Sequence, residues 1–404
     1  MPRAVVGAPT TAKSYRVGTH RVRTPEETWG RIATQLRHFG ITRMADLTRL
    51  DVLGIPVYQA VRPASRNLSV AQGKGSDPLA ARVSAAMEAI ELWHAEDLAH
   101  RVTRRDSLSR VSRDGGLDLA LLPWRYDPAP LADWTPEWIE LEALGAPPAG
   151  RARRAWVPRA LLELDLSQPE RFDLQPLRRS SNGLASGNCL EEAQLHGVCE
   201  LVERDAVAQG RLGRRQRHPL DPGTANPVLS ELLARIASAD FEVAFYDLTG
   251  PPGIPVIQAT LAGADLPEIW NGSGCHPSPQ VAALRALTEA AQCRLTYIAG
   301  VRDDLLRPDD PGADPAAVDG WDLRQALREQ RRREGEPVRR LEEIEDLATD
   351  SVADDLAAVL DRLARHGIHI WGSDLAKPAE NAPWGDAVSV YRVVSTDLHE
   401  AFFG

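Results

Sequence analysis

Three glycine-rich segments of the sequence are each followed by polar residues whose spacing could support chemistry. The segments are Gly73-Lys74-Gly75, Ser181-Asn182-Gly183 and Asn271-Gly272-Ser273-Gly274. The residues that follow are Ser84, Glu88 and Glu91, then Glu192, His196, Glu200 and Glu203, and finally Arg285, Glu289 and Gln292. Offsets of three and four residues place each set on one helical face, opposite apolar residues. A solvated surface explains any one such helix, but the recurrence favours a single shared site.

Carboxylates from three helices that meet in one cleft require cations. Their mutual repulsion raises their pKa values unless positive charge neutralises them. Mg²⁺ prefers such oxygen ligands and usually bridges them to nucleotide phosphates. Lys74, Arg285 and Arg294 could meet those phosphates, and glycine turns and helix N-termini also favour anions. The sequence contains no G-x-x-x-x-G-K-[ST] and no dinucleotide fingerprint, so a nucleotide would bind through a carboxylate–magnesium cradle and not a P-loop.

Cys275 and His276 also suggest chemistry, because a thiol beside an imidazole resembles a nucleophile with its base. Nucleophile and base normally come from separate elements, since adjacent side chains rarely orient toward each other. We therefore do not expect covalent cysteine catalysis. His196 lies on the carboxylate face of its helix, where a polar role in the site and a hydrogen-bonded core histidine both remain open.

Two nearly identical heptapeptides precede the first and third glycine-rich segments. Gly54-Ile-Pro-Val-Tyr-Gln-Ala60 and Gly253-Ile-Pro-Val-Ile-Gln-Ala259 each begin 19 residues before a glycine, Gly73 or Gly272. Each pattern indicates a buried strand, a turn and a helix. We expect internally repeated strand–turn–helix units around one cleft.

The composition is that of a globular enzyme of the cytoplasm. The chain has 404 residues, of which 43% are hydrophobic and 26% charged, and its formal net charge is -10. Such an acidic chain argues against nucleic acid as the main partner. The four cysteines form no C-x-x-C pair, and no apolar run reaches the roughly 20 residues of a membrane span or forms a signal-peptide core. We expect a cytoplasmic protein with no membrane partner.

Strands and helices alternate along the chain, which predicts an α/β or α+β fold. We divide the chain into an N-terminal arm and helix over residues 1–45 and a catalytic domain over residues 46–404. The catalytic domain carries a β-rich insertion at about 100–178 and a polar helical insertion at about 307–350, rich in Asp, Pro and Arg.

Local patterns predict individual elements within these parts. Residues 1–24 lack apolar periodicity and are expected to form a loose or partner-dependent arm. Thr24, Pro25 and Glu27 then have the form of a capped helix N-terminus, and the helix is expected to run to about His38. The other expected elements are a hairpin from strands at 138–142 and 155–157, whose tryptophans line a packed core or a peptide groove, a polar helix near 323–333, a last helix at about 352–365, and strands at 368–371 and 388–394.

At these residues the sequence resembles the YcaO family. The matching segments are Gly73-Lys-Gly75 with Ser84-x-x-x-Glu88-x-x-Glu91, Ser181-Asn-Gly-Leu-Ala-Ser-Gly-Asn188 with Glu192 and His196-Gly-Val-Cys-Glu-Leu-Val-Glu-Arg-Asp205, and Gly272-Ser-Gly-Cys-His276 with Arg285-Ala-Leu-Thr-Glu-Ala-Ala-Gln292-Cys-Arg294. The likeness extends from about residue 50 to the end of the chain. Three spaced motifs in the same order make it specific.

The resemblance implies a YcaO-like fold around one ATP and Mg²⁺ cleft, in an enzyme that activates a peptide backbone amide. The residues that it assigns to nucleotide binding are Lys74, Ser84, Glu88, Glu91, Glu192, His196, Glu203, Gln292 and Arg294. Those assigned to magnesium are Glu88, Glu91, Glu192, Glu200, Glu203 and Glu289. Glu200, Glu289 and Arg285 are assigned to catalysis.

The resembled chemistry begins with a nucleophile that adds to the amide carbonyl. Transfer of the ATP γ-phosphoryl group to the amide oxygen then makes that oxygen a leaving group. A neighbouring Cys, Ser or Thr gives an azoline, external sulfide gives a thioamide, and an amine gives an amidine. Azoline-forming members resemble one another in a proline-rich carboxyl end, whereas this chain ends Asp397-Leu-His-Glu-Ala-Phe-Phe-Gly404. It also shows no obvious leader-binding domain, and so resembles stand-alone members that work beside a TfuA-type partner.

We therefore expect thioamide formation in a ribosomally synthesised peptide or protein, with a sulfide donor and a TfuA-like or other leader-binding partner. Azoline or amidine formation, and ATP-dependent hydrolysis of the same bond, are the alternatives within the family. The alternative from another class is a catalytically silent scaffold that presents peptide to another enzyme. Such a scaffold predicts missing motif carboxylates, which this chain retains. A homodimer is a further open expectation.

Overall fold

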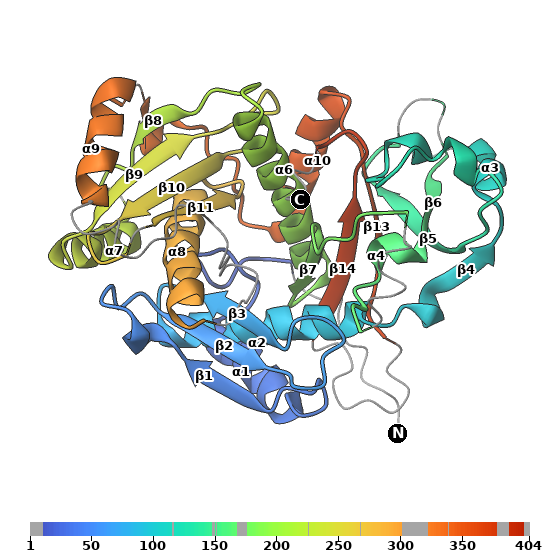
Figure 1. The fold of residues 1–404 in the computed structure, drawn as a ribbon, viewed down its shortest axis with the longest axis horizontal. Helices are drawn as coiled ribbons and strands as arrows, with labels where there is room; N and C mark the ends of the chain where they lie inside the picture. The colour runs from blue at the N-terminus through green and yellow to red at the C-terminus, as the bar shows by residue number, and fades with distance from the viewer. Residues whose placement is uncertain are drawn as a thin grey trace, which may run out of the picture.

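Three sheets and three long helices form the framework of the chain (Figure 1). The computed structural model describes residues 11–114, 117–147, 150, 152–167, 176–224, 226–266, 268–300, 322–337, 339–377 and 388–399. Its first sheet is antiparallel, with the order β1 (Arg43–Asp46), β2 (Val57–Val61), β3 (Val70–Lys74).

The other two sheets are larger. The five-stranded sheet is antiparallel except for its last pair and has the order β11 (Ile269–Cys275), β10 (Val256–Ala262), β9 (Glu242–Asp247), β8 (His218–Asp221), β12 (Arg339–Arg340). The six-stranded sheet is antiparallel and has the order β4 (Val102–Arg105), β5 (Glu137–Leu144), β13 (Ile370–Asp374), β14 (Ser389–Val394), β7 (Leu184–Gly187), with β6 (Arg154–Pro158) also paired to β5. The mixed architecture confirms the predicted fold class.

One long helix packs on each sheet, and each helix also contacts a strand of a second sheet. Helix α2 (Pro78–Ala95) lies on β2 and β3 and reaches β7. Helix α6 (Leu190–Arg211) lies on β7 and β14 and reaches β11. Helix α8 (Pro279–Ile298) lies on β10 and β11 and reaches β3. These cross contacts return to their starting point, so the three strand–helix joints β3–α2, β7–α6 and β11–α8 form one closed ring.

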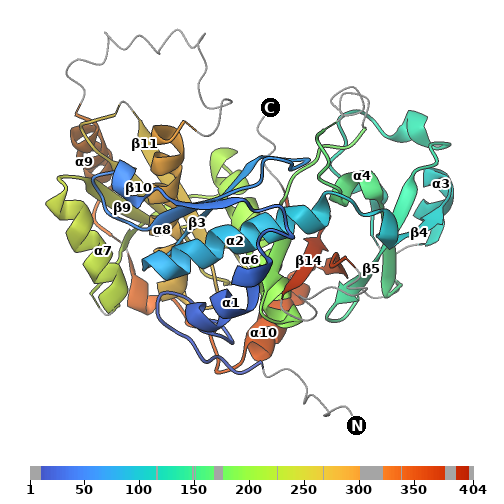
Figure 2. The same cartoon turned by 90° about the horizontal axis from the view of Figure 1, so that it is seen from below.

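The remaining helices support this ring from outside. Helix α1 (Pro25–Ile32) packs on α2, α10 (Val352–Arg365) packs on α6, and α7 (Pro227–Ser238) and α9 (Leu323–Glu334) pack on β9. The short helices α3 (Leu108–Val111) and α4 (Arg159–Leu162) belong to the β4–β6 region. Figure 2 shows α2 running across the molecule from the side of the five-stranded sheet toward β4 and β5.

Two of the three glycine-rich segments are strand ends and not the predicted turns. Gly73 lies in β3, and Gly272 and Gly274 lie in β11. A Cβ atom on Gly73 would lie 1.9 Å from the backbone nitrogen of Ala85, and one on Gly272 would lie 2.2 Å from the carbonyl oxygen of Ala286. Glycine is needed there because the helix backbone touches the strand.

The third segment does contain a turn, and the two heptapeptides share a conformation. Gly183 has φ +77° and directly precedes β7. Gly54 and Gly253 have φ +62° and +70°, and each stands three residues before its strand, β2 or β10. In both units an antiparallel strand pair leads into a long helix, so the order is strand, strand, helix. The duplication itself stays a prediction.

The predicted N-terminal helix exists but is shorter than expected. Thr24 and Glu27 form the capping box, and Pro25 is the first helical residue. The α-helix ends at Ile32, and a 3₁₀ turn followed by tighter turns carries the chain to Gly40, where φ is +74°. Phe39 is thereby turned into the core.

The elements predicted farther along the chain are confirmed where the structure describes them. β5 and β6 form the hairpin. Trp138 is buried in a hydrophobic core, and the partly exposed Trp134 and Trp156 pack against the same core, which favours the packed-core interpretation. α9, α10, β13 and β14 match the last four predicted elements. Residues 307–321 of the predicted polar insertion and the final residues 400–404 lie outside the described residues. No helix in the described part is long and apolar enough to cross a membrane.

Substitution of Gly73 by alanine is expected to destabilise the protein by about 1–3 kcal/mol or more, because the added methyl group meets helix backbone that cannot rotate away. Unfolding in guanidinium chloride measures the change. Gly210→Ala, at a position in α6 with no atom near the added Cβ, is the matched control. It should stabilise by about 0.5–1 kcal/mol. Similar effects of the two substitutions would contradict the close strand–helix contact.

Candidate active site

The ring of strand–helix joints brings side chains from the polar faces of α2, α6 and α8 together. We call this group of side chains the chamber; its members are Lys74, Glu88, Glu91, Glu192, His196, Glu200, Glu203, Arg285 and Glu289. Glu88 of α2 lies close enough to Lys74, Glu200 and Glu289 for their charges to act on its carboxyl group. Lys74 Nζ is 3.5 Å from Glu289 Oε2. The chamber therefore gathers residues that the sequence separates by more than 200 positions, as the helical spacing predicted.

Burial governs the ionisation of the central carboxyl groups. It raises the pKa of Glu88 to about 7, against the opposing charge of Lys74. It raises the pKa of Glu91 to about 8, although Ser186 donates to Glu91 Oε1 from its backbone N–H at 2.8 Å and its hydroxyl at 2.6 Å. Burial likewise raises the pKa of Glu200 to about 7. Buried carboxyl groups that lie close together have raised pKa values, and a bound cation would lower them again.

Two further glutamates are tied to the protein backbone. Glu203 accepts hydrogen bonds from the Ser273 hydroxyl at 2.8 Å and the Cys275 N–H at 3.0 Å, and burial and Glu289 raise its pKa. Glu192 accepts from the N–H groups of Asn188 at 2.8 Å and Val22 at 2.6 Å. These contacts occupy oxygens of both carboxylates.

Glu88 differs from the other glutamates of the chamber. Among the residues that the structure describes, it makes no hydrogen bond and no ion pair, while Glu91 is held by Ser186 and Glu200 accepts from the Gly183 N–H at 3.0 Å. Ser84, one turn before Glu88, is half-buried on the same helix. The carboxylate of Glu88 is therefore free to bind a ligand.

The two predicted cations, Lys74 and Arg285, lie in the chamber, and the charges of Arg204 and Arg21, which the sequence reasoning missed, also act on its carboxyl groups. Arg285 Nη2 lies 2.6 Å from His196 Nε2. A guanidinium group only donates, so His196 Nε2 accepts and its proton is on Nδ1. Burial and the nearby Arg285 hold the pKa of His196 well below its usual range. His196 is thus a neutral histidine that orients Arg285, which combines the two roles that the sequence left open.

Two predicted residues of α8 differ in position from Arg285 and Glu289. Gln292 Nε2 donates to the Gln72 carbonyl in β3 at 3.2 Å, which joins α8 to the first sheet at the rim of the chamber. Arg294 is 2% exposed and pairs with Asp51 at 3.0 Å and with Asp265. Arg294 lies on the opposite side of α8 from Arg285, because nine residues turn a helix by about two and a half rotations. Its assignment to the nucleotide site stays a prediction.

The structure also places residues in the site region that the helical spacing missed. Three polar residues donate hydrogen bonds to glutamates of the site, namely Ser186, Ser273 and Asn188. They lie in the glycine-rich motif segments, whose glycines drew attention to these segments, but nothing in the sequence singled out their own side chains. Val22 belongs to the arm, for which the sequence predicted looseness. That prediction is wrong for residues 11–24, whose backbone is bonded to the core.

Cys275 is no nucleophile in this setting. Its buried thiol lies beside Cys199, and burial raises its pKa well above the usual range. His276 Nδ1 accepts from the Ser278 N–H at 2.9 Å and does not approach the thiol as a base. The pair is structural, as expected from its adjacency.

The chamber fits Mg²⁺ and a nucleotide by its donor set. Carboxylate oxygens are the ligands that Mg²⁺ prefers, and the raised pKa values of Glu88, Glu91 and Glu200 show that the protein alone does not fully stabilise their ionised forms. Lys74 and Arg285 provide the positive groups that phosphate oxygens require.

Known proteins are similar to this chain in sequence and in fold. Residues 72–399 match the family model described as YcaO cyclodehydratase, ATP- and Mg²⁺-binding. A protein of Rhizobium leguminosarum bv. trifolii, named for its place in the tfuA 3′ region, is 41% identical over 301 residues, which cover 70% of this chain and 69% of the relative. The structure of YcaO from Methanopyrus kandleri bound with AMPPCP and Mg²⁺ has 25% identity and a TM-score of 0.72 over 97% of this chain and 95% of that one.

A heterocyclase in complex with substrate and cofactor has the same fold, with a TM-score of 0.71 at 21% identity. The match covers 98% of this chain and 54% of the heterocyclase, so this chain spans about half the length of that protein.

Without metal or nucleotide, we expect the ionisation of Glu88, Glu91 and Glu200 to lower the free energy of unfolding as the pH rises from about 4.5 to about 8. The folded state retains protons on Glu88, Glu91 and Glu200 up to pKa values of about 7 to 8, whereas the unfolded chain releases them near the ordinary value of 4.5. The penalty is absent below this window and complete above it. Mg²⁺ should therefore raise the melting temperature more at pH 8 than at pH 6.

Thermal melts across this pH range, with and without Mg²⁺, check the prediction. Glu88→Gln should flatten the pH dependence and weaken the Mg²⁺ effect, because it removes one ionising group. Glu191→Gln, at the position before Glu192 on α6, is the control and should leave the pH dependence and the Mg²⁺ effect unchanged. A Glu88→Gln profile identical to the wild type would show that Glu88 does not titrate in this window.

Proposed function

The chain belongs to the YcaO family, and on that premise we propose that it uses ATP and Mg²⁺ to replace a backbone amide oxygen of a ribosomally made peptide or protein by sulfur. The observation that carries the proposal is the convergence of Glu88, Glu200 and Glu289 from three helices beside Lys74 and Arg285. This arrangement can hold a magnesium nucleotide without a P-loop.

Each group of the chamber has a proposed task. Glu88, Glu91 and Glu200 would hold Mg²⁺, which offsets phosphate charge during phosphoryl transfer. Lys74 and Arg285 would contact phosphate oxygens, and His196 would keep the Arg285 guanidinium in place. Glu192 and Glu203 would act mainly by holding the backbone around the chamber, since that is where their oxygens are bonded.

The proposed reaction balances with hydrosulfide as the nucleophile. Its sulfur forms a bond to the amide carbon, and the γ-phosphoryl group of ATP passes to the amide oxygen. The carbon–oxygen bond then breaks, the oxygen leaves in inorganic phosphate together with the proton of hydrosulfide, and ADP remains.

The sulfur is proposed to come from outside the chain. Cys189, Cys199 and Cys275 are buried, so these three thiols are not accessible to a sulfur donor, whereas Cys293 is partly exposed and lies near Arg204. The relative named for the tfuA 3′ region supports a TfuA-like partner that delivers sulfide or peptide.

Azoline formation is the second candidate, because the matching family model is described as a cyclodehydratase. The same activated amide would then be attacked by a side chain of the substrate. Amidine formation and hydrolysis differ only in the nucleophile. A peptide-presenting scaffold is disfavoured, since the gathered carboxylates and their shifted pKa values serve no purpose in it.

Mass spectrometry of a peptide encoded beside this protein tests the proposal, after incubation with the partner protein, Mg²⁺, ATP and sulfide. Exchange of oxygen for sulfur is expected. Loss of water would instead establish azoline formation, and paired fragments would establish hydrolysis. No ATP consumption under any of these conditions, with folded protein, would support the scaffold.

Glu200→Gln is expected to lower kcat by about 100-fold or more while the protein still folds, because it removes a metal ligand of the phosphoryl-transfer site. The control is Glu191→Gln on the same helix, which should keep wild-type kcat. Initial rates of ADP release measure both. Equal rates for the two variants would remove Glu200 from the proposed mechanism.

A further inference from the structure

The N-terminal segment of residues 11–24 is built into the fold beside the chamber. Thr11 and Lys13 pair with the chain just before α10: the Val352 N–H donates to the Thr11 carbonyl, and the Lys13 N–H donates to the Asp350 carbonyl, each at 2.9 Å. Ala12 forms an antiparallel bridge with Ser351. The segment thus joins α10 to the centre of the molecule.

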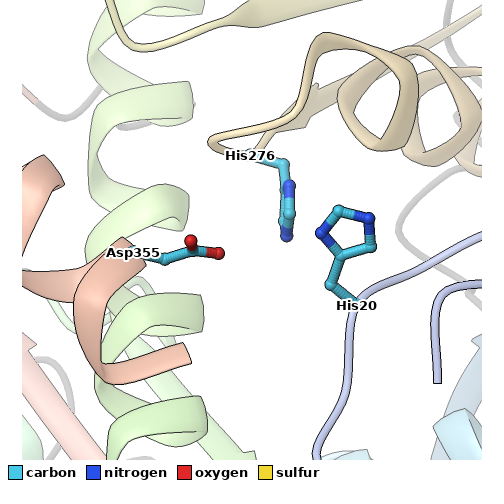
Figure 3. Close-up of side chains that lie close together, drawn as sticks. All are labelled: His20, His276 and Asp355. Carbon is cyan, nitrogen blue, oxygen red and sulfur yellow. The ribbon is translucent and has the colours of Figure 1, made fainter. Parts of the chain in front are cut away.

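A buried cluster surrounds the side chain of Lys13. Its Nζ lies 2.5 Å from Asp355 Oδ2, and both side chains are 0% exposed. The same Nζ is 2.8 Å from the Thr349 carbonyl and 3.3 Å from His20 Nδ1. Figure 3 shows His20, His276 and Asp355 pointing toward one another from three separate elements.

Two histidines and an aspartate are also a zinc-like ligand set, and their ligand atoms lie within 4.8 Å of one another. Two observations argue against a metal. The Lys13 ammonium group already neutralises Asp355. His276 Nδ1 accepts from the Ser278 N–H, so the neutral ring carries its proton on Nε2, the nitrogen that points into the cluster in Figure 3. That nitrogen donates and offers no lone pair to a metal.

A short run of contacts connects this cluster to Glu192. The Ser14 hydroxyl donates to the Val22 carbonyl at 2.8 Å, and the backbones of Tyr15 and Arg21 bond to each other in both directions. The Val22 N–H then donates to Glu192 Oε1 at 2.6 Å. These bonds close a loop between Lys13 and Val22, so anchoring Lys13 also restrains the position of Val22.

The cluster is also adjacent in sequence to a residue that binds Glu203. His276 follows Cys275, whose N–H donates to Glu203 Oε2 at 3.0 Å. His20 and His276 stack edge to face with ring centroids 5.1 Å apart. The contact between the two histidines therefore joins the arm, which donates to Glu192, to the end of β11, which donates to Glu203.

We propose that Lys13 is a positioning residue of the nucleotide site: its ammonium group takes the place of a metal ion in the His20–His276–Asp355 cluster and pins the arm so that Val22 holds Glu192 in the chamber. The inference rests on the proposed function, because it assumes that the chamber binds a magnesium nucleotide. It assigns the arm a part in nucleotide affinity although Lys13 itself lies outside the chamber.

The test replaces Lys13 by methionine in the full chain and measures binding of AMPPCP with Mg²⁺ by calorimetry. We expect the affinity to fall about 10- to 100-fold, as for other residues that orient a ligand through a second group. The rate at saturating ATP should change by less than about threefold, because the reacting groups are untouched. Amide hydrogen exchange at Val22 should become faster, which a general loss of stability would not confine to the arm.

Two more variants keep the test sharp. Ser14→Ala removes the hydroxyl link to Val22 without a buried charge change, and should weaken nucleotide binding in the same direction but less. Arg16→Met is the matched control, because Arg16 lies on the same arm but forms an exposed ion pair with Asp350. It should bind the nucleotide like the wild type.

Wild-type affinity and wild-type exchange at Val22 in a folded Lys13→Met protein would overturn the proposal. Tight, stoichiometric Zn²⁺ binding that is lost in His276→Ala would also overturn it, by showing a metal where we place the lysine. If the wild type binds no magnesium nucleotide, the proposed function itself is wrong. Exchange at Val22 then separately shows whether Lys13 fixes the arm.

Discussion

The burial of several carboxyl groups between three helices is the constraint on which this structure depends. Like charges in a poorly solvated chamber repel, and each buried carboxylate also loses hydration. The fold answers with backbone and hydroxyl donors from β7 and β11, and with Lys74 and Arg285 at close range. What remains uncompensated is visible in the raised pKa values of Glu88, Glu91 and Glu200. A site of this kind is prepared for divalent cations.

The closed ring of strand–helix joints makes that burial feasible. Glycines in β3 and β11 let the backbones of α2 and α8 touch their strands, and a glycine at the end of β7 does the same for α6. The helices therefore approach one another closely enough for their polar faces to share one volume. A side chain at any of these glycines would push a helix outward and separate the carboxylates that the chemistry needs together.

The glutamates then divide into two groups with different tasks. Glu192 and Glu203 spend their oxygens on backbone N–H groups and hold the arm and β11 in place. Glu88 has no such partner among the described residues and is open to a ligand. Rigid outer carboxylates and an available inner one are what a magnesium site requires, since Mg²⁺ tolerates little distortion of its ligand geometry. The same division explains why a buried lysine in the arm bears on the chamber.

The sequence by itself determined the helical faces and the family. Offsets of three and four residues are a local property of the α-helix, so Glu88 with Glu91 and Glu200 with Glu203 could be placed without knowing the fold. The capped helix at Thr24, the hairpin near Trp138 and the last helix and strands were equally local, and the structure contains them.

Only the tertiary structure decided what depends on partners distant in the chain. The glycines read as turns because turns are their commonest use, yet Gly73 and Gly272 are glycines because a helix backbone lies against them. Arg294 follows the site motif in sequence but faces Asp51 and Asp265 on the opposite side of α8. Residues 11–24 carry no periodic pattern, since their order comes from Lys13, Val22 and their remote acceptors Asp355 and Glu192. Local spacing cannot encode such contacts, because they exist only once the ring has closed.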